Sequence, residues 1–302
     1  MLKNFESLLE FKTKKQRLIV TCAHDEDVIE AIIMALKADL IQPILVGNKN
    51  EIEKIIKSKN VSLDLFEIIN ANSDQEAAYL SVEAIRNTKA DFIMKGLIDT
   101  KVLLKEVVNK ETGIRESNVL SHLTLLKFKN LNRLLFATDC GMLIAPNVEE
   151  KIAIIENALT LTKTLGYNQP LVGMVSAVEK ENPKIVSTTE AIYVSKHFES
   201  RSDVIVEGPF AIDNLVSMQS VKHKGIKSKV AGKADILIFP NIEAGNVFYK
   251  TSVFLAGAQP AGIILGAKCP IVLTSRADSS ISKYYSIILA AVYSYGKNNS
   301  SN

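Results

Sequence analysis

Three strand-to-loop segments organise this chain: ADILIFPNIEAGN (234–246), AGIILGAKCP (261–270) and PIVLTSRADSS (270–280). Each segment begins with a short apolar run that has the length and β-branched content of a buried parallel strand. In a parallel α/β sheet, every such exit lies at the carboxyl edge. We therefore expect one crevice to collect four polar side chains: Glu243, Asn246, Ser275 and Arg276.

Strands and helices alternate through the rest of the chain. In the first half, the apolar runs RLIVT, PILVG, FEIIN and DFIMKG are each followed by a segment with helical periodicity. Short connections between them predict right-handed crossovers and a doubly wound parallel sheet that is covered on both faces. A polar stretch, KETGIRESN (110–118), then interrupts the pattern before it resumes. We expect two α/β domains, one of residues 1–118 and 264–302, closed by the C-terminal helix, and one of residues 119–263.

Helical periodicity also predicts where several helices begin and end. The first is an amphipathic helix over residues 5–13, and the later ones cover residues 149–165, 188–199, 215–223 and 279–295. Asp278 directly precedes the last helix and is a good N-cap residue.

Composition excludes several classes of protein. The 302 residues are enough for two domains, and no apolar run approaches the roughly 18 to 20 residues of a membrane span. The N-terminus MLKNFESLLEFKTKK has no apolar core of a secretion signal. A net charge of +3 is too small to indicate nucleic-acid binding. We predict a cytoplasmic protein that binds neither membranes nor nucleic acid.

The cysteines and the absent motifs narrow the chemistry. Cys22, Cys140 and Cys269 have neither disulfide nor zinc-finger spacing, so we expect reduced thiols, none of them a nucleophile. No group of His, Cys, Asp and Glu has the spacing of metal ligands, and we predict no metal. The sequence also lacks the G-x-G-x-x-G, G-x-x-x-x-G-K-[ST], G-x-S-x-G and H-E-x-x-H fingerprints. These absences make an NAD-dependent dehydrogenase a weaker alternative.

Ser275 and Arg276 are the strongest candidates for catalysis. They follow a strand and precede a helix, whose free N–H groups favour a bound phosphate or carboxylate. The Arg276 guanidinium adds a planar fork that binds two oxygens at once. The alternative is structural, with Arg276 in a surface ion pair with Asp278 or Glu243 and Ser275 serving only as a cap.

Two further loops follow predicted strands. In NIEAGNVFYK, Gly245 allows a close backbone approach, Asn246 stands at a helix start, and Glu243 adds a carboxylate. In EGPFAID, Gly208 and Pro209 make a tight exit from the strand DVIVE. Asp213 follows within one turn and could be a base, a cap or a solvated side chain. Each loop could also be an ordinary connection.

The first half offers a smaller set of candidates. Lys95, Gly96 and Thr100 lie in MKGLIDT after the strand residues DFI and could contact an anion, although Lys95 could equally extend from a strand end into solvent. Cys22 and His24 lie two residues apart after a strand. We do not assign them as a nucleophile and its base, because no neighbouring residue is evident that would orient the imidazole. A histidine in a setting like that of His122 is more often partly buried and hydrogen-bonded than a ligand.

Several of these segments together resemble the phosphate acetyl/butyryltransferase family, and most closely its phosphate butyryltransferase branch. The likeness rests on segments in the family's order: AHDEDVIEAI (23–32), MKGLIDT (94–100), ATDCGMLIAPNVEEKIAIIENA (137–158), EGPFAIDN (207–214), KADILIFPNIEAGNVFYK (233–250) and GAKCPIVLTSRADS (266–279). The pairing of NIEAGN with a downstream LTSRADS is the most specific of them.

The resemblance implies reversible transfer of a butyryl or similar short acyl group between coenzyme A and inorganic phosphate, by direct attack in a ternary complex. It implies two doubly wound α/β domains with a cleft between them, as in isocitrate and isopropylmalate dehydrogenases, and a homo-oligomer of two or more copies. Coenzyme A, acyl phosphate and phosphate would be substrates, and no cofactor would be bound. Ser275 and Arg276 match the Ser-Arg pair that handles the phosphoryl group and the reacting carbonyl.

The resemblance also leaves residue roles open. The acetyltransferase branch assigns an Asp a few residues past the Ser-Arg pair as the base for the thiol, and that register reaches Ser282 here. Asp278 or Asp213 would then be the base. The first domain has Lys101 and Lys105 where acetyltransferases carry arginines that contact phosphate, which favours the butyryl branch.

Four alternatives stay open beside this reading. The enzyme could be a phosphate acetyltransferase, or a phosphate acyltransferase that takes its acyl group from acyl carrier protein. A metal- and NAD-dependent dehydrogenase of similar architecture is a third enzyme class. A protein that senses acyl-CoA or phosphate without turnover would keep the binding site but not the reaction.

Overall fold

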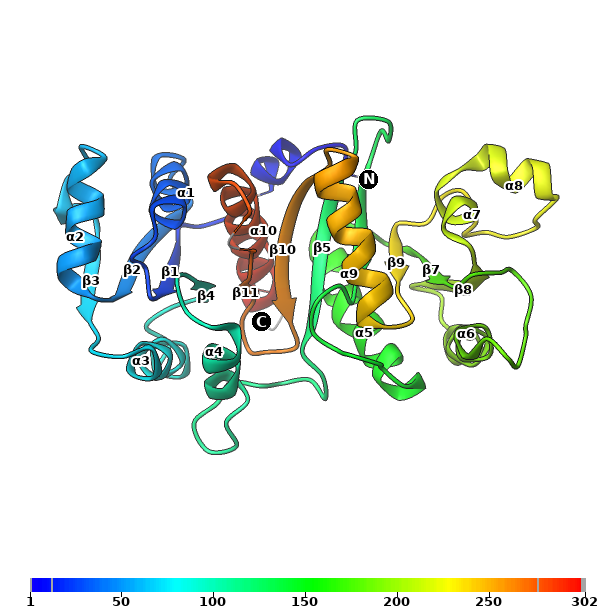
Figure 1. The fold of residues 1–302 in the computed structure, drawn as a ribbon, viewed down its shortest axis with the longest axis horizontal. Coiled ribbons are helices and arrows are strands. Elements are labelled where there is room, and N and C mark those ends of the chain that lie inside the picture. Colours follow the sequence, from blue (N-terminus) through cyan, green and yellow to red (C-terminus); the bar gives the residue numbers. More distant parts are fainter. Residues whose placement is uncertain (1, 12, 276, 300–302) are drawn as a thin grey trace. The chain divides into compact units, whose positions relative to one another are not determined.

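The computed structural model describes residues 2–11, 13–275 and 277–299. It divides into two compact units (Figure 1). We call Glu6–Ser117 together with Ala261–Asn302 the N-terminal unit, and Met1–Phe5 together with Asn118–Pro260 the central unit. Leu2 is tied into the central unit because its carbonyl oxygen accepts a hydrogen bond from the Leu134 N–H at 2.9 Å.

The N-terminal unit is built on a mostly parallel sheet. The strands follow one another across it in the order β3 (Glu67–Asn70), β2 (Ile41–Gly47), β1 (Gln16–Thr21), β4 (Phe92–Lys95), β11 (Ile271–Val272) and β10 (Gln259–Leu265). All neighbouring pairs are parallel except β10 with β11. The central strand β1 is buried along nearly all of its length, as its continuous apolar sequence predicts.

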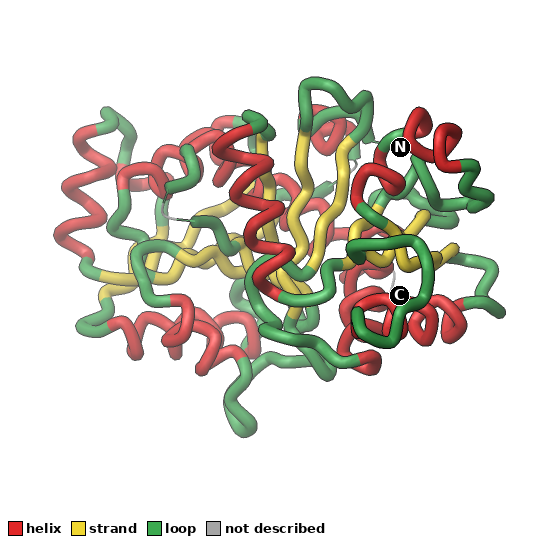
Figure 2. Tube along the Cα trace, turned by 45° about the vertical axis from the view of Figure 1, so that its right-hand side comes forward, coloured by secondary structure: helices red, strands yellow, loops and turns green. Residues whose placement is uncertain are grey.

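Helices cover both faces of this sheet (Figure 2). They are α1 (Glu26–Lys37), α2 (Lys49–Ser58), α3 (Asp74–Arg86), α4 (Thr100–Val107) and α10 (Ser280–Asn299), with short 3-10 turns at Glu6–Glu10 and Leu63–Leu65. Helix α1 packs against α10, and α3 packs against α4. The predicted doubly wound α/β layer is therefore confirmed for this unit.

The prediction that all three organising segments run parallel was wrong for one of them. Strand β10 is antiparallel to β11, with Ile263 opposite Val272. Only residues 266–270 connect the two strands, which suits a hairpin, whereas a parallel pair needs a crossover of a dozen or more residues. The end of β10 consequently lies at the edge opposite to the carboxyl ends of β4 and β11.

The central unit repeats the same plan. Its strands lie in the order β5 (Ser121–Lys127), β6 (Leu134–Thr138), β9 (Ile236–Ile238), β7 (Leu171–Val175) and β8 (Ile205–Phe210). Only β5 is antiparallel to its neighbour, so the start of β5 lies beside the end of β6. The helices are α5 (Val148–Thr164), α6 (Val186–Phe198), α7 (Ile212–Val216), α8 (Met218–Lys224) and α9 (Ile242–Lys250), which continues into a π-turn at Thr251–Leu255.

Two predicted helices differ from the structure. The first, over residues 5–13, is only the 3-10 turn Glu6–Glu10. The helix predicted over residues 215–223 is two helices, because Ser217 adopts an extended backbone (φ −120°, ψ 110°) and its Oγ accepts from the Ser220 N–H. Ser217 thus ends α7 and caps α8. Among the described residues, no helix combines the length and the apolar character needed to cross a bilayer.

Candidate active site

Asp139 organises the loop at the carboxyl end of β6. One carboxylate oxygen accepts from the backbone N–H groups of Gly141 (2.6 Å) and Met142 (2.7 Å), and the other accepts from the His122 N–H (3.0 Å). The residue is only 2% exposed. Burial raises the pKa of the Asp139 carboxyl, while these N–H groups and the nearby His122 ring oppose that rise. Asp139 therefore fixes the loop that follows β6 and ties it to the start of β5.

Helix α9 packs directly on this loop. A Cβ at Gly245 would come within 2.2 Å of the Asp139 carbonyl oxygen, so only glycine permits the approach. Asn246 donates from its side-chain amide to the Cys140 carbonyl oxygen at 3.3 Å. The structure thus brings two predicted site residues, Gly245 and Asn246, against the backbone of the loop that Asp139 holds, a residue that the site prediction did not include.

The prediction for the start of α9 was wrong. Asn241 is the N-cap, since its side chain accepts from the Ala244 N–H at 2.9 Å. Asn246 lies in the second turn, where its amide faces the loop after β6 rather than the helix terminus. Glu243 lies in the first turn and is exposed. Asn241 is five residues closer than Asn246 to the end of β9, so the loop between β9 and α9 is shorter than the sequence predicted.

Gly208 and Pro209 lie inside strand β8 rather than at its exit, which corrects the predicted turn. The ladder with β7 continues to Phe210 after a register shift between Gly173 and Val175. A proline without an N–H is tolerated there because β8 is the last strand of the sheet. Both residues line a cavity of about 770 Å³ at the carboxyl ends of β7 and β8.

Asp213 is engaged in an ion-pair cluster beside this cavity. Lys224, which lines the cavity, contacts the carboxylates of Asp213 at 3.3 Å and Glu179 at 3.0 Å. Glu179 also accepts a hydrogen bond from the side chain of Asn214, which is fully buried. The break between α7 and α8 at Ser217 turns Lys224 back toward Asp213, which the continuous helix predicted from the sequence would not do.

The predicted anion-binding residues of the N-terminal unit lie at the end of β4 and just after it. Lys95 is 7% exposed, so it does not extend into solvent, and its Nζ donates to the Gly96 carbonyl oxygen at 3.3 Å. A Cβ at Gly96 would lie 2.2 Å from the Cys22 carbonyl oxygen, which explains the glycine. Thr100 is the first residue of α4, after Asp99, whose side chain accepts from the Lys101 N–H.

Ser275 and Asp278 close a tight turn after β11. The Asp278 carboxylate accepts from the Ser275 N–H at 2.7 Å, and the Ser275 carbonyl oxygen accepts from the Asp278 N–H at 3.1 Å. The Ser275 Oγ accepts from the Ala277 N–H at 3.3 Å. Arg276 lies outside the described residues.

Asp278 is not the N-cap of α10, as the sequence had predicted. Ser279 directly precedes α10, and its Oγ accepts from the Ser282 N–H at 3.3 Å. The Asp278 side chain instead reaches back to Ser275. Its carboxylate, which is 6% exposed, holds the backbone at Ser275 in place.

The three thiols are buried and unbridged. Burial raises the pKa of Cys22 and of Cys269 to about 12 each, and raises that of Cys140 well above its ordinary value. A thiol in this state is a poor nucleophile near neutral pH. The described residues also hold no cluster of three or more His, Cys, Asp or Glu side chains that could bind a metal ion.

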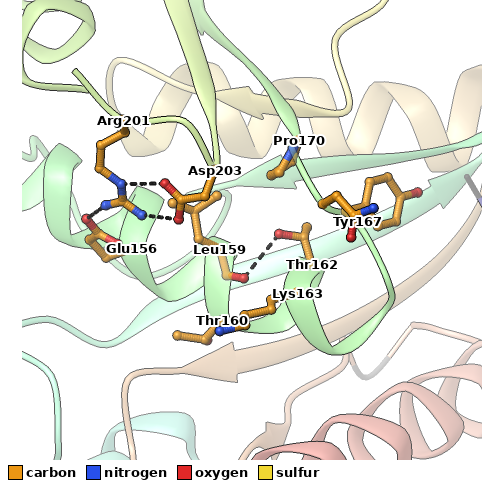
Figure 3. Close-up of a pocket in the computed structure, with 10 residues that line it drawn as sticks. Glu156, Leu159, Thr160, Thr162, Lys163, Tyr167, Pro170, Arg201 and Asp203 are labelled. Carbon is orange, nitrogen blue, oxygen red and sulfur yellow. Dashed lines mark hydrogen bonds and ion pairs between the residues drawn. The ribbon is translucent and has the colours of Figure 1, made fainter. Parts of the chain in front are cut away.

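A second cavity lies at the amino end of the strands β7 and β8, in the sheet of the central unit (Figure 3). It has a volume of about 370 Å³ and adjoins Pro170 and Asp203, which precede β7 and β8. Arg201 donates to both oxygens of Asp203, at 2.8 and 2.7 Å, and to Glu156 at 2.5 Å. None of the residues predicted for the site lines this cavity.

Comparisons with known proteins place these segments in a family. The family described as "Phosphate acetyl/butaryl transferase" matches residues 5–78 and 73–291. A phosphate acetyltransferase of Thermotoga maritima is 42% identical over 292 residues, covering 95% of this chain and 99% of the relative. A phosphate butyryltransferase of Clostridium acetobutylicum is 39% identical over 302 residues, covering 98% of this chain and 100% of the relative.

A solved structure agrees with these matches. It is a branched-chain phosphotransacylase from Enterococcus faecalis, with a TM-score of 0.85 and 30% identity, covering 93% of this chain and 99% of that one. The resemblance stated from the motifs is confirmed, and so is the enzyme class. The chain belongs to the phosphate acetyl/butaryl transferase family and is an acyltransferase.

Proposed function

We propose that this enzyme is a phosphate butyryltransferase, which converts butyryl-CoA and phosphate reversibly into butyryl phosphate and CoA. A phosphate oxygen attacks the thioester carbonyl carbon, the C–O bond forms, the C–S bond breaks, and CoA leaves as a thiolate that takes up a proton. The observation that carries the proposal is the likeness to a phosphate butyryltransferase over almost the whole of both chains. No covalent intermediate on the enzyme is needed, since positioning both substrates can supply much of the acceleration.

The turn after β11 would serve the phosphate end of the reaction. Arg276 would bind phosphate with its planar guanidinium, and the Ser275 hydroxyl would donate to the carbonyl oxygen as it becomes negative. The Ser275 Oγ uses an acceptor position for the Ala277 N–H, which leaves its proton for this donation. Asp278 would position Ser275 through the hydrogen bond to its backbone rather than act as the base.

Each unit carries further residues that suit parts of the substrates. In the N-terminal unit, Lys95, Gly96 and Thr100 supply a buried cation and a closely packed backbone at the end of β4. In the central unit, Gly208 and Pro209 line the cavity whose wall also carries Lys180 and Lys227. These lysines suit the anionic part of coenzyme A. Glu243, Gly245 and Asn246 form the first turns of α9 over the loop after β6.

The direct test is release of CoA from butyryl-CoA with and without phosphate. We expect linear release that depends on phosphate. The variant Arg276→Ala should lower kcat at least ~10²-fold, the usual scale for losing one preorganised charge contact, and raise the KM for phosphate. Arg276→Lys keeps the positive charge but loses the planar guanidinium, so its kcat should lie between those of the wild type and of Arg276→Ala. Near-normal kinetics of Arg276→Ala would remove this residue from the site, and binding of butyryl-CoA without turnover would favour a sensor.

Acetyl transfer is the second candidate, because the Thermotoga maritima relative is named a phosphate acetyltransferase. Comparing kcat/KM for acetyl-CoA, butyryl-CoA, a branched acyl-CoA and the acyl-carrier-protein thioester separates the acyl donors. We expect butyryl-CoA to give the highest value. The cytoplasmic location and the homo-oligomeric state stay predictions, the latter to be tested by gel filtration with light scattering.

A further inference from the structure

His122 lies where the start of β5 meets the end of β6. It is the second residue of β5 and is 8% exposed. Its backbone N–H donates to the Asp139 carboxylate at 3.0 Å, which fixes the position of its Cα. Because β5 and β6 are antiparallel, this pairing puts the histidine at the carboxyl edge of the parallel strands β6, β9 and β7.

The groups around the His122 ring come from α9 and from the loop after β6. The ring meets the edge of the Tyr249 ring on α9, with centroids 6.4 Å apart and planes at 90°. Gly141, in the loop after β6, leaves its Cβ position open, and a Cβ there would lie 3.8 Å from the imidazole Cγ and Nδ1. Two titratable residues in contact with His122 are Asp139 and Tyr249. Among them, Asp139 interacts electrostatically with the imidazole.

A buried polar pair at this place lowers the stability of the fold unless hydrogen bonds compensate for its lost hydration. Leu123, Leu125 and Leu126 on the same strand are fully buried, and the neighbouring cluster is apolar. Burying a carboxylate and an imidazole in such surroundings requires compensation by hydrogen bonds, and Asp139 receives three from backbone N–H groups. A carboxylate beside an imidazole also stabilises the protonated ring, which is how a histidine base is prepared to accept a proton.

The other carboxylates predicted as bases are already engaged. Asp213 forms an ion pair with Lys224, and Asp278 holds the Ser275 backbone. A thiol of ordinary pKa about 8.5 is matched more closely by an imidazole of about 6.5 than by a carboxylate of about 4.

We propose that His122 is the general base for the CoA thiol and that Asp139 positions it and balances its charge. This inference rests on the proposed function. In the direction from butyryl phosphate, the thiol proton passes to the imidazole, sulfur forms a bond to the carbonyl carbon, and the C–O bond to phosphate breaks with its electron pair on phosphate. The imidazolium then releases the proton to the departing phosphate or to solvent. In reverse, the imidazolium protonates the leaving CoA thiolate.

The test measures kcat/KM against pH for CoA with butyryl phosphate, in the wild type and in His122→Asn and His122→Gln. Loss of a general base typically costs 10²- to 10⁴-fold, and we expect kcat/KM to fall by about that much and the acidic limb of the profile to disappear. His122→Ala should regain activity with added imidazole, which a purely structural role would not produce. His197→Asn, an exposed histidine on α6, is the matched control and should leave the profile unchanged.

The outcomes separate this inference from the proposed function. A wild type that does not convert CoA and butyryl phosphate would overturn the proposed function itself. An active wild type together with His122→Asn and His122→Gln that keep their rate within about threefold and retain the acidic limb would overturn only the role of His122. Melting temperatures show whether each variant is folded. If both substitutions unfold the protein, absence of an acidic limb in the wild-type profile overturns the proposal.

Discussion

The two ends of the sheet in the central unit hold their charges in different ways. At the amino end, Arg201 is matched by the carboxylates of Asp203 and Glu156 and lies over the Phe198 ring, 5.5 Å from its centroid. At the carboxyl end, Asp139 is held by backbone N–H groups beside His122. Opposite charges that satisfy one another leave little for a ligand, whereas a carboxylate held by the backbone keeps its neighbour prepared for proton transfer. A well-formed cavity is therefore weaker evidence of a site than the way its charges are compensated.

The largest effect should come from breaking the carboxyl end. In Asp139→Ala, three N–H groups lose their acceptor, those of His122, Gly141 and Met142. Each unsatisfied buried donor costs about 1 to 3 kcal/mol, so we expect the free energy of unfolding to fall by roughly 3 to 5 kcal/mol. Butyryl transfer should fall with it, by at least ~10²-fold in kcat/KM, because His122 loses its position. Urea unfolding and the CoA-release assay measure the two effects.

Asp139→Asn is the control for this change. It keeps one oxygen for Gly141 and Met142 but turns an amide toward the His122 N–H, so it should be more stable than Asp139→Ala and still impaired in activity. Full activity in a folded Asp139→Ala protein would contradict the contrast between the two ends.

The matching change at the amino end should separate stability from activity. Arg201→Met removes both ion pairs but keeps much of the packing on Phe198. Since the side chains of Arg201 and Asp203 are 31% and 60% exposed, solvent screens their attraction and we expect a loss of only ~1 kcal/mol. The kcat/KM for butyryl-CoA should stay within about twofold, because none of the predicted site residues lines that cavity.

Kinetics and urea unfolding of the Arg201→Met protein check this expectation together. A tenfold fall in kcat/KM with unchanged stability would show that the amino end takes part in the reaction. Salt provides a further check, because the stability difference from wild type should shrink at high ionic strength.

The sequence revealed the elements of the site more readily than their pairing. The strands β1, β4 and β9 and the exits after them follow from continuous apolar runs, and the Ser275–Arg276 pair followed from its place between strand and helix. The composition of a strand does not show whether it runs parallel or antiparallel to its neighbours. The prediction for β10 was therefore a parallel strand. The same limit hid the Asp139–His122 pair, since these residues are 17 positions apart and meet only because β5 runs antiparallel to β6.

The roles of single carboxylates depended on contacts that spacing does not encode. Asp213 pairs with Lys224 only because Ser217 breaks the predicted helix into α7 and α8. Asp278 turns back to Ser275 although its position before α10 suits an N-cap. Asp139 could have been singled out as an acidic residue that directly follows the apolar strand LLFAT, the same signal that selected the exits elsewhere.

The smallest expected effect is an alkaline titration that reports on the amino end alone. Tyr167 lines that cavity, and its hydroxyl oxygen accepts from the Leu2 N–H at 3.3 Å. Burial, first of all, raises its pKa from 10.0 to about 12.

Between pH 10 and 12 the unfolded chain loses the Tyr167 proton while the folded protein keeps it. The tyrosine contribution to stability is therefore intact below pH 10 and declines as pH rises through that window. Because Tyr167 is partly exposed and the measurement ends near pH 11, we expect this decline to stay below ~1 kcal/mol. Tyr167→Phe should therefore show a flatter loss of stability with pH than the wild type, measured by urea unfolding at pH 9 to about 11, and the ultraviolet absorbance of tyrosinate gives the titration directly. Identical pH dependence in the two proteins would mean that the buried environment of the amino end does not hold the phenol proton, and the contrast drawn between the two ends would then rest on the ion pairs of Arg201 alone.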